Sequence, residues 1–156
     1  MFVKQSKKNL KDIKMIDTQK NRYLEQLICL VVDDDKFARN FTKTALFQIG
    51  MKNIKEASSA AEAEEIIKNT KIDLLFTDQQ MPEKNGLDMI ADLLKIDPTF
   101  TKKIPTIMIT SDTRETTVLK AKELNIREYI IKPLSPATLK KRVYNILNIK
   151  ESTSRD

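Results

Sequence analysis

The sequence predicts an α/β protein whose parallel sheet carries helices on both faces. From residue 27 onwards, five short strand-like runs alternate with five longer segments of helical character. The first run, residues 27–32, is apolar throughout, as in a strand that is buried on both faces. The segment after it has an apolar residue at every fourth position (Phe37, Phe41, Ala45 and Ile49), which indicates a helix. Five such units in about 120 residues predict one doubly wound domain.

Turn and capping residues delimit the predicted elements. Gly50 can cap the first helix, and Asp97-Pro98 stops the third, because the residue before a proline disfavours the helical conformation. The predicted strands cover residues 27–32, 53–57, 73–78, 104–112 and 128–131. The predicted helices cover residues 37–49, 59–69, 87–96, 114–125 and 137–149.

The order of these elements brings acidic residues together. Right-handed crossovers leave few topologies, and five strands favour the order 2-1-3-4-5, in which strands one and three are neighbours. Asp33 and Asp34 end the first strand and Asp78 ends the third. Ligands of such sheets bind at the carboxyl ends of the strands, at this switch point. We therefore expect the three carboxylates to meet in one crevice. Asp35, in the first turn of the next helix, is assigned to helix capping.

Composition excludes several kinds of site. The 156 residues contain no histidine, which excludes histidine triads, histidine acid–base catalysis and histidine metal sites. Any metal must then be bound by oxygen atoms, which favours a hard ion such as Mg²⁺. Cys29 is the single cysteine, so no intramolecular disulfide can form. No apolar run approaches the roughly 20 residues of a membrane span, and no signal-peptide pattern is present. We expect a cytoplasmic protein with no membrane insertion.

Residues 1–26 are more basic than the rest of the chain. They hold seven lysines and arginines against three acidic residues, in a chain of net charge +6. Such an arm can contact nucleic acid or an anionic membrane surface, or it is a solvated tail. We expect residues 1–25 to form a basic N-terminal extension, partly disordered or helical. Residues 26–149 then form the α/β domain, and residues 150–156 form a C-terminal tail.

The residues at the strand ends suggest phosphoryl chemistry. Carboxylates clustered like Asp33, Asp34 and Asp78 repel one another unless they surround a divalent cation. Thr110 ends the fourth strand with a hydroxyl, and Lys132 ends the fifth with a point charge suited to phosphate. Together these groups predict a phosphoryl-transfer pocket in which a carboxylate is the nucleophile. Each residue alone has a structural explanation, such as helix capping by an aspartate. Their common position at the strand ends favours a functional site.

Four sequence motifs carry a resemblance to a known family. VVDDD, LLFTDQQMPEKNG, IMITSD and YIIKPLS occur in this order and with this spacing. They resemble the receiver domain of two-component response regulators, in its stand-alone, chemotaxis-regulator-like form, over about residues 26–149. The resemblance implies a flavodoxin-like (βα)5 fold with strand order 2-1-3-4-5. It also implies that Asp78 accepts a phosphoryl group from a sensor histidine kinase or a histidine phosphotransfer protein.

The resemblance also implies roles for the remaining residues. Thr110 and Lys132 would contact the phosphoryl oxygens. Tyr129 occupies the position of an aromatic switch residue, which packs inward when Thr110 moves towards the phosphate. The Lys132–Pro133 peptide bond is expected to be cis. The implied Mg²⁺ ligands are Asp33, Asp34, Asp78 and the backbone carbonyl of Gln80.

The expected function is that of a phosphorylation-controlled signalling switch with Mg²⁺ as its cofactor, which signals by partner binding or phosphorelay. Seven residues follow Ile149, so we expect a stand-alone receiver without an output domain. Beyond phosphoryl transfer to itself and slow self-dephosphorylation, no enzymatic activity is expected. One alternative is a Mg²⁺-dependent phosphatase with an aspartyl-phosphate, which normally needs an acid where Gln80 stands. The other is a basic nucleic-acid-binding module, which the absence of a glycine-rich loop disfavours.

The downstream target is expected to bind the face made by the helix at 114–125, the strand at 128–131 and the helix at 137–149. A rearrangement of Thr110 and Tyr129 would alter this face. Its charge favours an acidic partner, because basic residues outnumber acidic ones there. The basic residues of this face are Lys120, Lys122, Arg127, Lys140, Lys141 and Arg142.

Overall fold

Five parallel strands form the central sheet of the computed structural model, which describes residues 16–151. The strand order is β2-β1-β3-β4-β5, so the predicted topology is confirmed. Every neighbouring pair of strands is parallel, as the alternation of strands and helices predicts. The strands are β1 (Ile28–Val32), β2 (Asn53–Ala57), β3 (Leu74–Thr77), β4 (Thr106–Thr110) and β5 (Glu128–Ile131).

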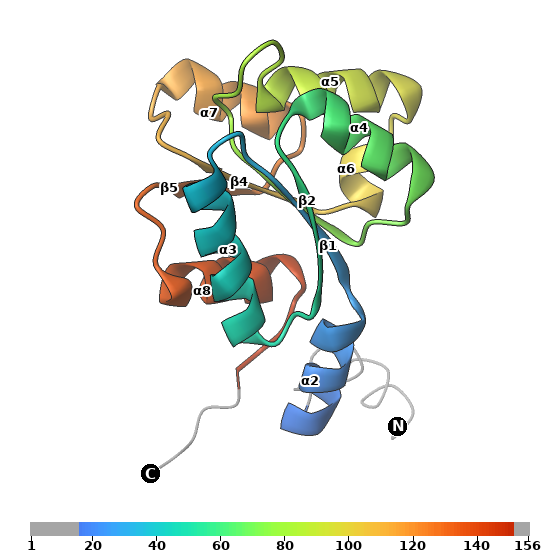
Figure 1. Cartoon of the computed structure of the whole chain (residues 1–156), viewed down its shortest axis with the longest axis vertical. Coiled ribbons are helices and arrows are strands. Elements are labelled where there is room, and N and C mark those ends of the chain that lie inside the picture. Colours follow the sequence, from blue (N-terminus) through green and yellow to red (C-terminus); the bar gives the residue numbers. More distant parts are fainter. Residues whose placement is uncertain (1–15, 152–156) are drawn as a thin grey trace, which may run out of the picture.

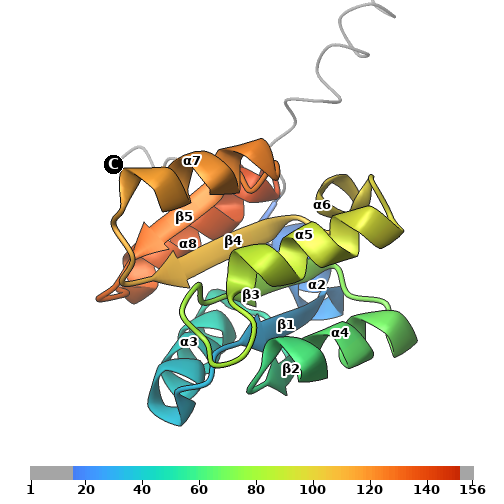
Figure 2. The ribbon, with the colours of Figure 1, turned by 90° about the horizontal axis from the view of Figure 1, so that it is seen from above.

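Helices cover both faces of this sheet (Figures 1 and 2). The five predicted helices correspond to α3, α4, α5, α7 and α8, each within a few residues of its predicted range. The short helix α6 was not predicted, and α2 lies in the basic extension, where a helix was one of the expectations. The helices are α2 (Asp17–Gln26), α3 (Lys36–Ile49), α4 (Ala60–Asn69), α5 (Gly86–Ile96), α6 (Phe100–Lys103), α7 (Glu115–Glu123) and α8 (Pro136–Ile146).

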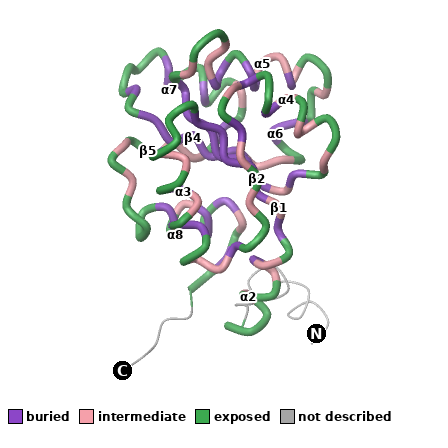
Figure 3. The backbone as a smooth tube through the Cα atoms, in the orientation of Figure 1, coloured by how far each residue is buried: buried purple, intermediate pink, exposed green. Residues whose placement is uncertain are grey.

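The strands divide their side chains between two cores, one on each face. Cys29 and Val31 of β1 pack in the core that contains buried residues of α3 and α8. Leu30 and Val32, which alternate with them, pack in the core that contains buried residues of α4, α5 and α7. Successive side chains of a strand point to opposite faces, so a continuously apolar strand fits a sheet covered on both sides. In Figure 3 the tube is purple, the colour of buried residues, along much of the central strands.

Caps fix the ends of α3. Asp35 is its N-cap, and the Asp35 carboxylate accepts a hydrogen bond from the Phe37 N–H at 2.8 Å. This confirms the capping role predicted for Asp35. Gly50 follows the last turn with a φ of 116°, a conformation that a side chain would strain. These caps define where α3 begins, directly beyond the carboxyl end of β1.

The buried face of α3 differs from the stripe seen in the sequence. Phe37 is 87% exposed and Phe41 is 51% exposed, whereas Thr42, Ala45 and Leu46 are buried. A stripe at every fourth residue drifts around a helix of 3.6 residues per turn, so its two ends cannot both face the core. The spacing of the phenylalanines therefore located the helix without identifying its buried side. Both rings remain on the surface near the carboxyl ends of the strands.

The helix α2 packs on the opposite end of β1. Leu24 is fully buried in the core shared with α3 and α8, and Tyr23 packs against the same core. Residues 1–15 and 152–156, most of the predicted extension and tail, lie outside the described residues. Between residues 16 and 151, none of the helices is long and apolar enough to cross a membrane.

Candidate functional site

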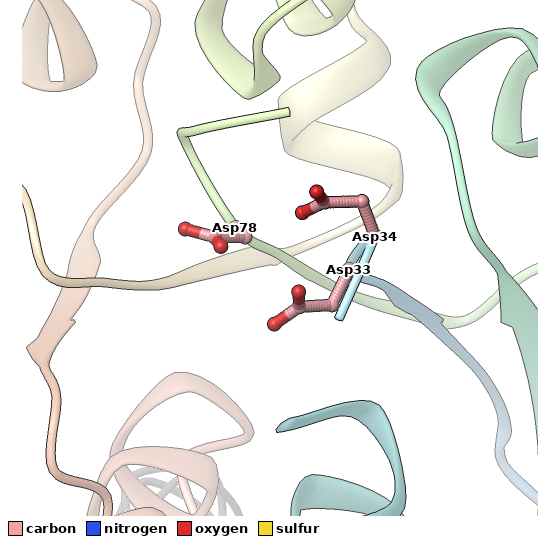
Figure 4. A group of neighbouring side chains, drawn as sticks. All are labelled: Asp33, Asp34 and Asp78. Carbon is pink, nitrogen blue, oxygen red and sulfur yellow. The ribbon is translucent and has the colours of Figure 1, made fainter. Parts of the chain in front are cut away.

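The register of β1 and β3 brings the predicted acidic residues together. Val32 and Thr77 are partners in the parallel ladder, so the residues that follow them, Asp33 and Asp78, lie side by side. The Asp78 N–H donates to the Val32 carbonyl at 2.9 Å, which extends the pairing to the site itself. One carboxylate oxygen from each of Asp33, Asp34 and Asp78 lies within 4.8 Å of the others. Figure 4 shows the three side chains next to one another, with their carboxylates on the same side of the strand ends.

Backbone amides hold the carboxylate of Asp78. Its Oδ1 accepts a hydrogen bond from the Gln79 N–H at 2.7 Å and a longer one from the Gln80 N–H at 3.4 Å. Its Oδ2 accepts a hydrogen bond from the Lys132 ammonium at 3.2 Å. Asp78 is buried, with 8% of its surface exposed. The carboxylate is therefore fixed in direction at the rim of the sheet, where a group arriving from solvent can reach it.

The two acids of β1 differ in environment. Asp33 is buried, and its carboxylate accepts hydrogen bonds from the Asp35 N–H at 2.9 Å and the Lys132 ammonium at 3.0 Å. Burial raises the pKa of Asp33 against the lowering effect of these hydrogen bonds. Asp34 is exposed. One buried and one exposed carboxylate beside Asp78 give an oxygen-only donor set open to solvent, which fits a hard divalent cation.

Lys132 connects the fifth strand to both acids. Its N–H donates to the Thr110 carbonyl at 2.9 Å, and its ammonium bridges Asp33 and Asp78. The Lys132–Pro133 peptide bond is cis, as the resemblance implied. Burial lowers the pKa of Lys132, but the hydrogen bond to Asp33 and the charge of Asp78 outweigh it, so this pKa is raised. Lys132 is therefore cationic at neutral pH and partly neutralises the acids.

The two predicted switch residues meet at the backbone of Asp112. Thr110 is fully buried, and its hydroxyl oxygen accepts a hydrogen bond from the Asp112 N–H at 3.2 Å. The Tyr129 hydroxyl donates to the Asp112 carbonyl at 2.8 Å. Burial, followed by the charge of Asp112, raises the pKa of Tyr129 to about 12, so this hydroxyl keeps its proton. A movement of Thr110 would thus reach Tyr129 through one shared residue.

Asp112 has further contacts that the sequence reasoning missed. Its buried carboxylate accepts hydrogen bonds from the guanidinium of Arg114, at 2.6 Å for the shortest, and from the Thr117 hydroxyl at 3.1 Å. These contacts hold the loop between β4 and α7 against the first turn of α7. An aspartate two residues before the start of a predicted helix is a known turn signal, which could have identified it.

Gln79 and Gly86 position the loop that follows Asp78, and they too were missed. The Gln79 side chain is buried and accepts a hydrogen bond from the Leu87 N–H at 2.8 Å. The Gly86 N–H donates to the Gln79 carbonyl at 3.0 Å. A β-carbon at residue 86 would overlap the carbonyl oxygen of Asp78, so only glycine fits there. The signal available in the sequence was Gly86 itself, one of only two glycines in the chain.

The described residues thus bring together Asp33, Asp34, Asp78 and Lys132, while the Thr110 hydroxyl contacts Asp112 instead of the acids. Gln80 is exposed beside Asp78, and the metal-binding role of its carbonyl stays a prediction. Fold and site define a doubly wound α/β protein with an acidic, lysine-bridged pocket at the switch point of its sheet. Such a pocket is suited to divalent cations and phosphoryl groups.

Comparison with known proteins identifies the family. Residues 29–144 match the family described as response regulator receiver domain. The chain belongs to this family, which is the receiver domain family of the response regulators of two-component signalling. The matched span contains the site described above and leaves α2 outside it.

The relatives include several chemotaxis proteins. The chain is 36% identical over 123 residues to chemotaxis protein CheY1 of Helicobacter pylori, which covers 78% of this chain and 98% of that protein. It is 34% identical over 119 residues to chemotaxis protein CheY of Thermotoga maritima, covering 76% and 92%. Among solved structures, it resembles the CheX-CheY-BeF3-Mg complex from Borrelia burgdorferi with a TM-score of 0.73 and 25% identity, covering 82% of this chain and 98% of that one.

Proposed function

We propose that the protein is a signalling switch controlled by phosphorylation of Asp78. The observation that carries this proposal is the bridge from the Lys132 ammonium to the carboxylates of Asp33 and Asp78, at 3.0 and 3.2 Å. The ammonium can move to the oxygens of a phosphoryl group attached to Asp78, because these oxygens lie next to the carboxylate that it now contacts. Family membership supports the same assignment.

The donor of the phosphoryl group is proposed to be a phosphohistidine on a sensor kinase or a phosphotransfer protein. An Asp78 oxygen attacks phosphorus, the P–N bond breaks as the O–P bond forms, and the nitrogen keeps the electron pair and takes up a proton. Hydrolysis of the resulting acyl phosphate returns the carboxylate. No substrate other than this phosphoryl group is proposed to be turned over.

Mg²⁺ is the proposed cofactor of this transfer. Asp33, Asp34 and Asp78 would hold it with carboxylate oxygens, and the Gln80 carbonyl would complete the protein ligands. When bound, the ion supplies positive charge that offsets the negative charge of the phosphoryl oxygens. Asp33 is buried and Asp34 is exposed. This difference supports the assignment, since an exposed ligand leaves room for water and phosphate oxygens.

The phosphodonor is proposed to dock on the exposed phenylalanines of α3. Phe37 and Phe41 lie in the first two turns of α3, which begins directly after the acidic residues of β1. Phe41 lines a hollow of about 210 Å³ together with Lys132, Pro133 and Leu134. Large apolar side chains exposed together are unusual on a surface without a partner. A donor protein that covers them would bring its histidine to Asp78.

The downstream target is proposed to bind the face made by α7, β5 and α8. Three of its basic residues already have acidic partners: Lys120 pairs with Asp88, Lys140 with Glu151 and Arg142 with Glu128. Its available positive charge is therefore smaller than the sequence alone suggests. Exposed Leu119 and Ile131 add apolar area to the same face. Tyr129, which belongs to β5, would transmit the state of Thr110 to this surface.

The proposal is tested by labelling with acetyl phosphate and Mg²⁺, followed by intact-mass measurement. Wild-type protein should gain one phosphoryl group, and Asp78→Asn should gain none. Asp34→Asn should need at least about tenfold more Mg²⁺ for the same labelling, because one exposed ligand is lost. Equal labelling of wild type and Asp78→Asn would contradict the assignment. Sustained hydrolysis of p-nitrophenyl phosphate would instead favour the phosphatase alternative.

A further inference from the structure

Asp34 is the proposed Mg²⁺ ligand whose side chain has the least support. It is exposed, and its carboxylate has no hydrogen-bond or ion-pair partner within residues 16–151. Asp33 and Asp78, by contrast, are each held by a backbone N–H and by the Lys132 ammonium. The direction of the Asp34 carboxylate therefore depends on the backbone that carries it.

A guanidinium from the first turn of α3 contacts this backbone. Nη1 of Arg39 donates a hydrogen bond to the Asp33 carbonyl at 2.8 Å. This carbonyl belongs to the planar peptide unit that joins Asp33 to Asp34, so the hydrogen bond restricts rotation of that unit. On the other side of Asp33, its N–H donates to the Ala57 carbonyl at the end of β2, at 3.1 Å. Asp33 is thus fixed at both of its backbone groups, and the start of Asp34 is fixed with it.

The guanidinium is itself held in place. Nε of Arg39 donates to the Glu56 carboxylate of β2 at 3.4 Å, and the Lys43 ammonium donates to the other oxygen of that carboxylate at 3.0 Å. The Arg39 side chain is 15% exposed. Its planar fork presents donors in two directions, which lets one arginine hold a carboxylate and a carbonyl together. A lysine has a single flexible ammonium and cannot reproduce both contacts.

The charge of Arg39 and its hydrogen bond to Asp33 have opposite effects on a bound cation. A positive charge near a cation site repels the ion, so the charge alone would weaken Mg²⁺ binding. A hydrogen bond that orients the ligands strengthens binding, because the site is arranged before the ion arrives. The sign of the effect of losing Arg39 therefore shows which contribution is larger.

We propose that Arg39 is a positioning residue for the Mg²⁺ site. It holds the peptide unit between Asp33 and Asp34, so that the Asp34 carboxylate starts from a fixed backbone next to the carboxylates of Asp33 and Asp78 (Figure 4). Arg39 acts through this backbone and does not contact the ion. The inference rests on the proposed function and adds the residue that keeps the most exposed ligand ready for Mg²⁺.

Titration of the full chain with Mg²⁺ alone, followed by the amide NMR signals of residues 33–36, tests this proposal. Arg39→Gln should weaken Mg²⁺ binding at least about tenfold, as does the loss of other groups that orient metal ligands. Arg39→Lys keeps the charge but loses the fork, so it should weaken binding at least about threefold. The same spectra show whether each variant is folded.

Lys36→Gln is the matched control. Lys36 is exposed in the same turn of α3, and its side chain has no hydrogen-bond or ion-pair partner in the described part of the chain. Loss of its charge should leave Mg²⁺ binding unchanged or tighten it by up to about twofold, because salt screens exposed charges. This variant therefore reports the effect of charge alone.

Labelling of Asp78 separates this inference from the proposed function. At Mg²⁺ concentrations that saturate each protein, Arg39→Gln should still gain one phosphoryl group from acetyl phosphate, because Arg39 does not contact the reacting atoms. Wild-type protein that binds no Mg²⁺ would contradict the proposed function and this inference together.

Two results would overturn the inference and leave the proposed function intact. The first is a folded Arg39→Gln variant that binds Mg²⁺ as tightly as the wild type or more tightly, which would reduce the role of Arg39 to its charge. The second is an Arg39→Lys variant with the wild-type affinity for Mg²⁺, which would show that the guanidinium contacts are dispensable.

Discussion

Lys132 shows how single residues balance charge at this site. Its ammonium is held between Asp33 and Asp78, and all three groups are mostly removed from solvent. Removing one partner of such a buried set leaves an uncompensated charge, which is strongly destabilising. The same arrangement keeps two carboxylates close to each other in the absence of a cation. Charge balance and readiness to receive a phosphoryl group therefore depend on one lysine.

Gly86 gives a prediction about the positioning of Asp78. Gly86→Ala would push a methyl group into the Asp78 carbonyl, so the loop after β3 must shift. We expect a loss of about 2 kcal/mol in the free energy of unfolding, as for other overpacked sites. We also expect slower labelling of Asp78 by acetyl phosphate. Urea denaturation and intact-mass kinetics measure the two effects.

Gly50→Ala is the matched control for this variant. Gly50 has a φ of 116°, so alanine there is strained and costs about 1 kcal/mol. Its β-carbon would make only an ordinary contact with Leu24, remote from the acids. The control should lower stability without slowing the labelling. If both variants label at the wild-type rate, Gly86 does not position Asp78.

Asp112 gives a prediction about pH. Its hydrogen bond to Arg114 lowers the pKa of the Asp112 carboxyl in the folded protein. As the pH falls, the Asp112 carboxyl is therefore protonated in the unfolded chain before it is protonated in the folded protein, at a pH of about 4. The stabilising contribution is present above that pH and is lost as pH falls towards the lower folded pKa. Asp112→Asn should cost about 2 kcal/mol at pH 7, and the difference from wild type should shrink below about pH 4.

Glu115→Gln provides the comparison for Asp112, because it removes one carboxylate from the first turn of the same helix. It should be close to wild type at pH 7. Arg114 is 69% exposed, so high salt should reduce the effect of Asp112→Asn. Chemical denaturation across pH measures these differences. A constant difference between Asp112→Asn and wild type from pH 7 to pH 3 would contradict the role of the ionised carboxylate.

The residues of the site differ in how far the sequence could predict them. Asp33, Asp34, Asp78 and Lys132 were located because each follows a recognisable strand, and the sheet topology then brings these ends together. Gln79, Gly86 and Asp112 act through backbone contacts inside loops. Such contacts depend on the local path of the chain, which strand and helix periodicity does not describe.

At the scale of elements, α3 links the site to its proposed phosphodonor. Phe37→Ser combined with Phe41→Ser should lower the kcat/KM of phosphotransfer from a sensor kinase that labels the wild type, at least about tenfold. Both rings are largely exposed, so stability should change little. Labelling by acetyl phosphate should stay within about twofold, because a small donor does not need the docking surface.

Phe47→Ser is the control on the same helix. Phe47 is 47% exposed but lies in the last turn of α3, away from the pocket, where its ring contacts Lys43. The Phe47→Ser variant should accept the phosphoryl group from the kinase at the wild-type rate. Equal losses in the control and in the double variant would show that helix stability, not docking, explains the effect.

The elements themselves were largely predictable. All five strands and five of the helices follow from apolar runs, helical period and capping residues such as Asp35 and Gly50. The buried face of α3 did not follow, because its apolar residues serve both the core and the surface. The attachment of α2 depends on Leu24 and Tyr23 in the core, the Lys20–Tyr144 contact with α8 and the hydrogen bond from Asn53 to the Glu25 carbonyl, which no local pattern reveals.

At the scale of the whole molecule, the acidic pocket and α2 lie at opposite ends of β1. The carboxyl ends of the strands carry the acidic pocket, and α2 packs at the other end of the sheet. The topology could be predicted because right-handed crossovers leave few arrangements of five parallel strands. The contact between α2 and α8 became evident only in the three-dimensional structure.

The central claim is that Asp78 receives the phosphoryl group. Reduction of the freshly labelled protein with borohydride converts an aspartyl phosphate to homoserine, and peptide mass spectrometry then locates the changed residue. The account predicts homoserine at residue 78, in a yield that falls when Mg²⁺ is chelated before labelling. Homoserine at residue 33 or 34 instead of residue 78, or no reducible acyl phosphate at all in labelled protein, would contradict it.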